Sequence, residues 1–318
     1  MQKIELNMPQ NNQMLHFPVG HIMDRVLSLF HIVVSDNIHI QAIDNGLKKG
    51  IKYVLNDAPV GQPASLTGEN VIEVNDNYCE FLYLICYAFL VINDCCLVLT
   101  DNVEGEASIS KEEAESYCRE AGEMLSEALK MLLPNENDNN YMAASRGKLF
   151  RFPNTSKPNK YTDFSDSMTI AGLTYILHHE FGHFIFEHDE DTPFNELDAD
   201  KHAILHLKRW GEATKNENTI FAGIILALVA SAFINPTLTA TSYPDIDDRI
   251  EYALQFADDT LKENPNSLLY RIIGFSANIW ANHFKVDIPK IASNESHKEY
   301  VCRIKAALVN HKRKTKII

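Results

Sequence analysis

The sequence predicts an α+β fold that is mostly helical and carries a small, largely antiparallel sheet near the N-terminus. Segments with strand character fill the first quarter of the 318 residues, and helix signals fill most of the last two thirds. The chain shows no internal repeat and no Gly- or Ser-rich linker. We therefore expect one domain over residues 1–318, with a sheet-rich part at 1–75 and a helical part at 76–318.

Four segments of the first quarter have the residue types of strands. They begin at His31 (HIVV), Ile38 (IHIQAI), Ile51 (IKYVL) and Val71 (VIEV). Turn signals such as Asn45-Gly46 separate them. Because the segments are short and closely spaced, we expect them to pair mainly as antiparallel neighbours.

Two long helices follow the sheet-rich part. Asp76 opens the run NYCEFLYLICYAFLVIN, which is apolar nearly all round and therefore predicts a helix buried between other layers. Such a helix could back an active site. Ser110 and Glu113 form a capping box ahead of KEEAESYCREAGEMLSEALKML, whose apolar residues recur at helical spacing until Pro134. We expect this second helix at the surface.

The stretch from Pro134 to Asp166 is rich in Asn, Ser and Pro and shows no period, so we expect a long irregular loop. Loops of this length often serve as lids or binding segments. Helix signals then return at 167–187, 195–210, 218–234, 246–261, 266–284 and 295–312. Asn195 is the expected N-cap of the second of these helices, and Gly211 its stop.

The charge of the chain argues against some classes of partner. A formal net charge of −14 repels nucleic acid and anionic lipid, so we expect neither a nucleic-acid nor a membrane partner. Positive residues do gather near the C-terminus, where Lys305, His311, Lys312, Arg313, Lys314 and Lys316 lie. A solvated tail is the expected interpretation, and contact with an anionic partner is the alternative.

Several features predict a cytoplasmic protein. The amino end lacks the basic start, apolar segment and small-residue cleavage site of an export signal. The six cysteines form no C-x-x-C pair, which favours reduced, packed thiols. The uncharged run Ile220 to Ile234 is shorter than the roughly 18 to 20 residues needed to cross a bilayer, so we expect a core helix. A membrane-embedded enzyme stays the alternative.

The segment LTYILHHEFGHFIFEH contains the pattern H-E-x-x-H as His179, Glu180 and His183. Residues four apart lie on one face of a helix, so both imidazoles can reach a single metal ion at about 2.1 Å. Glu180 would then point toward a water molecule at that ion. A catalytic zinc site needs three protein ligands and one open position, so a third ligand must come from elsewhere.

The next segment, NELDADKHAILHLKRW, supplies that ligand. Glu196 and Asp200 lie four apart on one helical face, and Ala199 between them is small enough to let two helices approach. Glu196 is the expected third metal ligand. Asp200 is expected to accept a hydrogen bond from the outer ring nitrogen of a ligand histidine, which fixes its tautomer.

Three alternatives compete with a catalytic metal site that has these ligands. A short pattern can arise by chance, but charged groups in an apolar helix cost several kcal/mol unless they are paired or bound to metal. A structural zinc site would close its fourth position with another Cys or His, and none is evident nearby. His178, His188 and His202 could also compete as ligands, although His178 faces another side of the helix and His188 lies five residues beyond His183.

The two segments together resemble the gluzincin peptidases, whose second motif is E-x-x-A-D, matched here from Glu196 to Asp200. The sequence from LTYILHHEFGHFIFEH through NELDADKHAI is similar to that of the Lit-type phage-exclusion peptidases of bacteria. This likeness spans about Val71 to Ala253, with long gaps. It implies a zincin-like domain and Zn²⁺ as the cofactor. Related gluzincins carry T-H-P and then an arginine.

This chain departs from that later motif. It has Tyr243 in place of the histidine, and Arg249 matches the arginine. Tyrosine can donate a hydrogen bond to developing negative charge, so Tyr243 is a candidate oxyanion donor. The alternative is that Tyr243-Pro244 forms a turn and that Arg249 caps a helix or pairs with Asp245.

The residues therefore predict a zinc-dependent endopeptidase in which Glu180 acts as general base. The resemblance further implies phage exclusion, with cleavage of translation elongation factor Tu during infection and a phage-derived peptide as candidate activator. An edge strand of the early sheet could hold an extended protein substrate. The rival function is a non-catalytic module that keeps the scaffold to bind a partner, although binding alone does not need Glu180.

Overall fold

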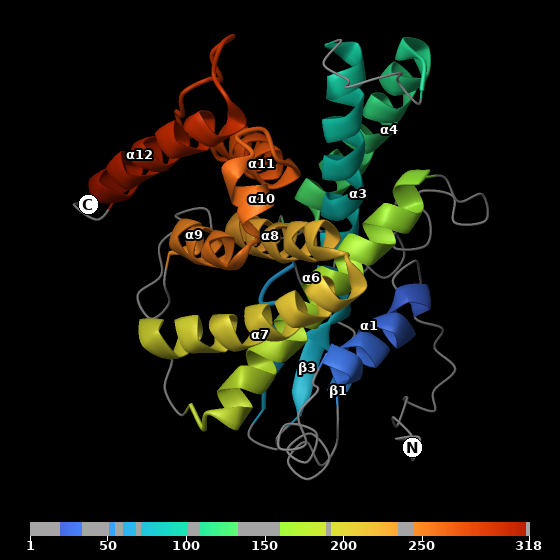
Figure 1. Ribbon diagram of the computed structural model, residues 1–318, viewed down its shortest axis with the longest axis vertical. Helices are drawn as coiled ribbons and strands as arrows, with labels where there is room; N and C mark the ends of the chain where they lie inside the picture. Colours follow the sequence, from blue (N-terminus) through green and yellow to red (C-terminus); the bar gives the residue numbers. More distant parts are fainter. Residues whose placement is uncertain are drawn as a thin grey trace, which may run out of the picture.

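The computed structural model describes residues 20–33, 51–54, 60–67, 71–100, 109–132, 160–188, 192–234 and 245–315 (Figure 1). The described helices are α1 (Gly20–Val33), α3 (Asp76–Leu99), α4 (Lys111–Lys130), α6 (Lys160–Ile185), α7 (Pro193–Thr214), α8 (Glu217–Ile234), α9 (Ile246–Phe256), α10 (Asp259–Glu263), α11 (Leu268–Phe284) and α12 (His297–Thr315). The strands are β1 (Ile51–Val54), β2 (Ala64–Leu66) and β3 (Ile72–Asn75). The predicted fold class, mostly helical α+β with a small sheet near the N-terminus, is confirmed.

The sheet is mixed. Strand β3 lies between the other two and pairs with β2 antiparallel and with β1 parallel. The expected antiparallel pairing therefore holds for β2 and is wrong for β1. The strands predicted at Ile51 and Val71 correspond to β1 and β3. The pattern does not predict β2, because three residues are too few to show a period.

Helix α1 replaces one predicted strand. His31 to Val33, which open the segment HIVV, form the last turn of α1. Its buried residues are Ile22, Met23, Val26, Leu27, Leu29, Phe30 and Val33. That spacing is helical, and it outweighs the local β-branched character of HIVV. The strand predicted at Ile38 lies outside the described residues.

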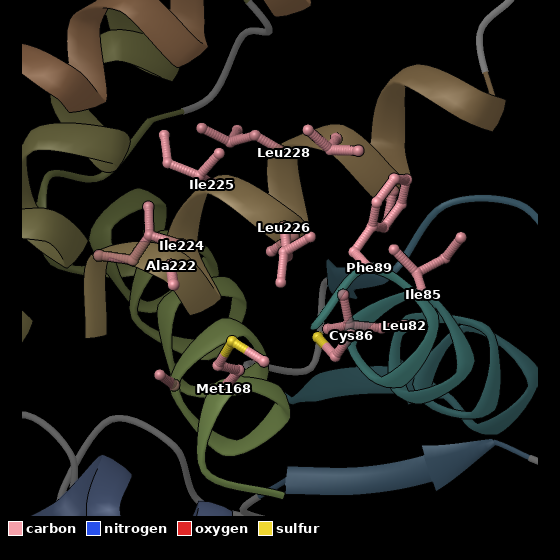
Figure 2. Close-up of a cluster of buried hydrophobic side chains, with 14 of the residues drawn as sticks. Leu82, Ile85, Cys86, Phe89, Met168, Ala222, Ile224, Ile225, Leu226 and Leu228 are labelled. Carbon is pink, nitrogen blue, oxygen red and sulfur yellow. The ribbon is translucent and has the colours of Figure 1, made fainter. Parts of the chain in front are cut away.

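The core forms where α3, α6 and α8 meet. Figure 2 shows side chains of α3, including Leu82 and Cys86, near Met168 of α6 and Leu226 of α8. Most residues of α3 are buried, as its all-round apolar sequence predicts, and α4 packs beside it (Figure 1). The helix that carries the H-E-x-x-H pattern, α6, is thus held from both sides by apolar helices.

Two described helices, α3 and α8, are long and apolar enough to cross a bilayer by length and composition alone. In the fold, 67% of the most apolar 18-residue stretch of α3 and 72% of that of α8 are buried. Burial of this extent is what core helices show.

Glycine lets α6 and α8 approach closely. A Cβ atom added at Gly223 of α8 would lie 2.4 Å from the carbonyl oxygen of Met168 and 2.7 Å from the Cβ of Ala171. Both distances are too short for real atoms, so only glycine fits at this crossing. The contact fixes the distance between α8 and α6, the helix that carries the H-E-x-x-H pattern.

One predicted helix start is confirmed and two differ from the prediction. The capping box of α4 is confirmed, because the Ser110 side chain accepts from the Glu113 backbone and Glu113 accepts in return. Helix α6 begins at Lys160, so the last part of the predicted loop is helical, and the rest of that loop lies outside the described residues. Thr192, not Asn195, is the N-cap of α7, with Pro193 at its first position.

The C-terminal helices also correct two expectations. Residues 246–261 form two helices, α9 and α10, because the chain turns at Ala257 and Asp258 caps α10. Lys312 does not belong to a solvated tail: its ammonium donates to Asp245 and Asp247 and its exposed fraction is 7%. All six cysteines are free, but the expected packing holds only in part: Cys79, Cys86 and Cys95 are buried, whereas Cys96 and Cys302 are exposed.

Candidate metal centre

Three side chains from two helices point their donor atoms at one place. The Nε2 atoms of His179 and His183 on α6 lie 3.2 Å apart. Each lies 3.3 Å from a carboxylate oxygen of Glu196 on α7. Ligands about 2.1 Å from a tetrahedral zinc ion would lie roughly 3.4 Å from one another. The three residues therefore have the chemistry and the spacing of a metal-binding group.

The meeting of α6 and α7 depends on two small residues. A Cβ atom added at Gly182 would lie 3.0 Å from the Cα of Ala199, closer than nearly all real contacts of this kind, so a larger residue would push the two helices apart. On α7, Glu196, Ala199 and Asp200 lie on the buried face. The close approach places the Glu196 carboxylate over the two imidazoles, as the helical spacing predicts.

Asp200 holds the outer ring nitrogen of His179. The Nδ1 atom of His179 lies 2.9 Å from Oδ1 of Asp200. Arg249 of α9 donates to both carboxylate oxygens at 2.6 and 2.7 Å, and the Tyr175 hydroxyl donates at 2.5 Å. Asp200 is thus fully hydrogen-bonded inside the protein, which makes its burial tolerable.

The charges of this group favour a proton or a cation at its centre. Burial alone would lower the pKa of His179, but hydrogen bonds to Asp200 and Glu196 raise it to about 9. Burial alone would raise the pKa of Glu196, but the two histidines lower it to about 2. Burial also opposes ionisation of Asp200, yet the positive charge of Arg249 holds its pKa well below the usual range. A metal ion would displace the proton from His179.

His188 holds the outer nitrogen of the second histidine. Its Nδ1 atom lies 3.0 Å from Nδ1 of His183, and its Nε2 atom lies 4.0 Å from a carboxylate oxygen of Asp198. His188 is therefore placed beside a ligand and not among the donors. The motif does not reveal this role, because it depends on the turn after α6, which folds His188 back toward His183.

The other two competing histidines lie away from the donor group. His178 places Nε2 3.1 Å from the carbonyl oxygen of Phe30 on α1. His202 places Nδ1 3.1 Å from the carbonyl oxygen of His178. Among the described residues one other acidic group has metal-like spacing, formed by Asp245, Asp247 and Asp248, and it is already bound by Lys312.

The donor group opens into a cleft of about 610 Å³. Glu180 lies in its wall next to the two histidines and is 8% exposed. Burial raises the pKa of Glu180, and the neighbouring histidines partly offset that rise. Strand β2 forms one side of the cleft and α8 contributes Ala227, Leu228, Ser231 and Ile234. A peptide could therefore reach Glu180 between a strand edge and an apolar helix.

The structure brings together all but one of the predicted site residues. His179, Glu180, His183, Glu196 and Arg249 line the same cleft. Tyr243 lies outside the described residues.

No curated protein and no solved structure matches the chain. A sequence model of the Peptidase U49 family matches residues 72–268, which is more than half of the chain and includes α3, β3 and both helices of the donor group. The chain therefore belongs to the Peptidase U49 family and is a peptidase.

Proposed function

We propose that this peptidase is a zinc-dependent endopeptidase of the gluzincin type, with His179, His183 and Glu196 as metal ligands. The observation that carries the proposal is the convergence of these donors, 3.2 to 3.3 Å apart, beside the buried carboxylate of Glu180. Two histidines and one glutamate leave a fourth position open, as catalytic zinc sites require.

A zinc ion held there would act as a Lewis acid toward the scissile carbonyl and acidify a water molecule. Glu180 accepts the proton of the attacking water and passes it to the departing amine. Burial suits Glu180 to both steps, because its raised pKa brings it closer to neutral pH. Asp200 keeps the proton of His179 on the outer nitrogen, which leaves Nε2 free to bind the metal.

Strand β2 is the proposed docking site for the substrate backbone. Among the described strands β2 pairs on one side only, with β3, and its residues Ala64 to Leu66 line the cleft. An extended peptide can add to such an edge through main-chain hydrogen bonds. The apolar side chains of Leu66, Leu228 and Ile234 on the cleft walls would accept apolar side chains of the substrate.

We further propose a phage-exclusion role in the cytoplasm, with translation elongation factor Tu as candidate substrate and a phage-derived peptide as candidate activator. The likeness to Lit-type peptidases and the family match support this proposal. The extensive burial of α3 and α8 favours a water-soluble enzyme over a membrane-embedded one. Glu180, present in the cleft, favours an enzyme over a non-catalytic module.

The test compares the wild-type protein with Glu180→Gln and with Glu187→Gln, which alters an exposed glutamate just after α6. Each protein is loaded with zinc and incubated with elongation factor Tu, with and without the candidate peptide, and products are identified by mass spectrometry. We expect cleavage by the wild type and Glu187→Gln, and none by Glu180→Gln although it retains zinc. Undiminished cleavage by Glu180→Gln would rule out its role as base. Cleavage of other proteins but not of the elongation factor would remove only that substrate.

A further inference from the structure

A second cavity lies behind the wall of the metal cleft. It has a volume of about 420 Å³, opens to the surface and is lined by residues of α8, α9, α10, α11 and α12. Its lining shares no residue with that of the cleft. Cavities of roughly 300 to 1,000 Å³ with mostly apolar walls are the usual sites of small ligands. The match to the family ends at residue 268, so most of α11 and all of α12 lie beyond it.

The inner part of this cavity is apolar, and its mouth is lined by charged side chains. The apolar lining includes Val229, Phe233, Ile250, Leu254, Ile273 and Trp280. Phe233 and Trp280 are buried, whereas Lys298 at the mouth is exposed. A ligand that fits must therefore be apolar along its length and polar at one end.

The lining of the cavity carries one more lysine than carboxylates: Lys262, Lys298 and Lys305 against Asp247 and Glu251. Glu251 pairs with Lys305, the Lys262 ammonium lies 2.8 Å from Asp259, and Lys312 is shared by Asp247 and Asp245. Among the described residues, Lys298 has no carboxylate within ion-pair distance. Its ammonium donates to the carbonyl oxygen of Lys262 at 3.0 Å and lies 5.7 Å from the centre of the Tyr270 ring. The surplus of one positive charge suits a head group with one negative charge.

We propose that this cavity binds a free medium-chain fatty acid, with its carboxylate at Lys298 and its chain between α8, α9 and α11. The single surplus cation argues against a doubly charged phosphate head, because it can balance only one of the two charges, whereas it balances one carboxylate. The size of the cavity argues for one acyl chain. This inference does not depend on a metal at the cleft.

Two helices connect the cavity to the metal centre. On α8, Val229 and Phe233 line the cavity, whereas Leu228 and Ser231 line the cleft. On α9, Ile250 lines the cavity and its neighbour Arg249 holds Asp200. A bound fatty acid would therefore stabilise the wall that positions Arg249.

The chain's two tryptophans, Trp210 and Trp280, allow a direct binding test. In a Trp210→Phe background, the fluorescence reports only Trp280 in the cavity wall. Octanoate, decanoate and dodecanoate are titrated below their micelle concentrations. We expect saturable binding that tightens about fourfold for each added methylene until the cavity is full. Dodecanol and dodecyltrimethylammonium are expected to bind at least tenfold more weakly than dodecanoate.

Variants locate the site. Lys298→Gln is expected to weaken dodecanoate binding about tenfold and to leave dodecanol binding unchanged. Lys290→Gln, which removes a nearby exposed charge outside the cavity, is expected to bind as the parent does. Ala277→Leu narrows the cavity and should weaken dodecanoate and dodecanol alike.

Three outcomes would overturn the proposal. The first is no saturable binding by any of the fatty acids. The second is equal affinity for dodecanoate and dodecanol, with no effect of Lys298→Gln. The third is sedimentation of the protein with phosphatidylglycerol vesicles in the absence of any binding to free fatty acid, which would make this face a membrane contact.

Discussion

The Nδ1 atom of His179 lies 2.9 Å from Oδ1 of Asp200, and Arg249 donates two hydrogen bonds to the same carboxylate. The arrangement orients the ring of His179 through a carboxylate that Arg249 and Tyr175 hold in turn. An outer partner of this kind sets the tautomer and the basicity of a ligand histidine. The contact joins α6, α7 and α9 at one point.

Asp200→Asn is expected to weaken metal binding about 10- to 100-fold, because the outer partner of His179 loses its charge. It also removes the charge of the carboxylate that the largely buried guanidinium of Arg249 contacts most closely and leaves only Glu196, at 3.9 Å, as its counter-charge, which should cost roughly 3 kcal/mol of the free energy of unfolding. Competition with a chelator measures the first effect, and urea unfolding of the metal-free protein the second. Asp287→Asn, at an exposed position, is the control. Equal metal affinity in wild type and Asp200→Asn would contradict this account of the contact.

His188→Ala is expected to weaken metal binding about tenfold while leaving the fold intact, because His183 loses the partner of its outer nitrogen. Asn can still accept a hydrogen bond, so His188→Asn should recover part of the loss. Absorption spectra of the cobalt-substituted proteins would report a changed ligand geometry independently of activity. His283→Ala changes a histidine far from the cleft and serves as control. If His188→Ala and His283→Ala have the same affinity as the wild type, His188 does not position the ligand.

Lys312→Met removes the ion pairs that join α12 to Asp245 and Asp247 at the start of α9. Burial alone would lower the pKa of Lys312, but Asp245 and Asp247 raise it above its ordinary value of 10.5. A raised pKa in the folded state means that protonated Lys312 stabilises the fold below about pH 10.5. That stabilisation is lost as the pH rises through the pKa that Lys312 has in the folded state.

The variant should therefore be less stable by about 2 kcal/mol at pH 7, and the difference should shrink above pH 10.5. Thermal unfolding at pH 7, 9 and 11, with Lys290→Met as control, measures this. A difference that stays constant up to pH 11 would show that Lys312 acts through packing and not through its charge.

Gly223→Ala and Gly122→Ala should change stability in opposite directions. The first places a Cβ atom against the backbone of Met168 and should destabilise the protein by about 3 kcal/mol or more. The second adds a Cβ atom with nothing within 4 Å on helix α4, and should stabilise by about 0.5 to 1 kcal/mol. Urea unfolding of both variants gives the comparison. Tolerance of alanine at position 223 would mean that α6 and α8 do not pack this closely.

The sequence is most informative where local chemistry and helical spacing agree. The four-residue spacing of His179 and His183 predicts two donors on one face, and Glu196 and Asp200 follow the same rule on the next helix. The capping box at Ser110 predicts a helix start because its hydrogen bonds are local. Such features depend on residues a few positions apart.

Features that depend on contacts between distant segments are not visible in the sequence. HIVV has β-branched residues, but the burial of α1 against α6 decides its conformation. The basic C-terminal run predicts a solvated tail, yet Lys312 is buried because α12 returns to Asp245 and Asp247. His188 contacts His183 only because the turn after α6 folds back. The second cavity likewise exists only once five helices have packed.

The central claim is that His179, His183 and Glu196 hold one metal ion. Inductively coupled plasma mass spectrometry of purified wild type and Glu196→Ala tests it most directly. We predict about one zinc per chain in the wild type and little or none in Glu196→Ala, since two histidines alone do not make a stable zinc site. Equal zinc in the two proteins, or none in either after incubation with zinc, would contradict the claim.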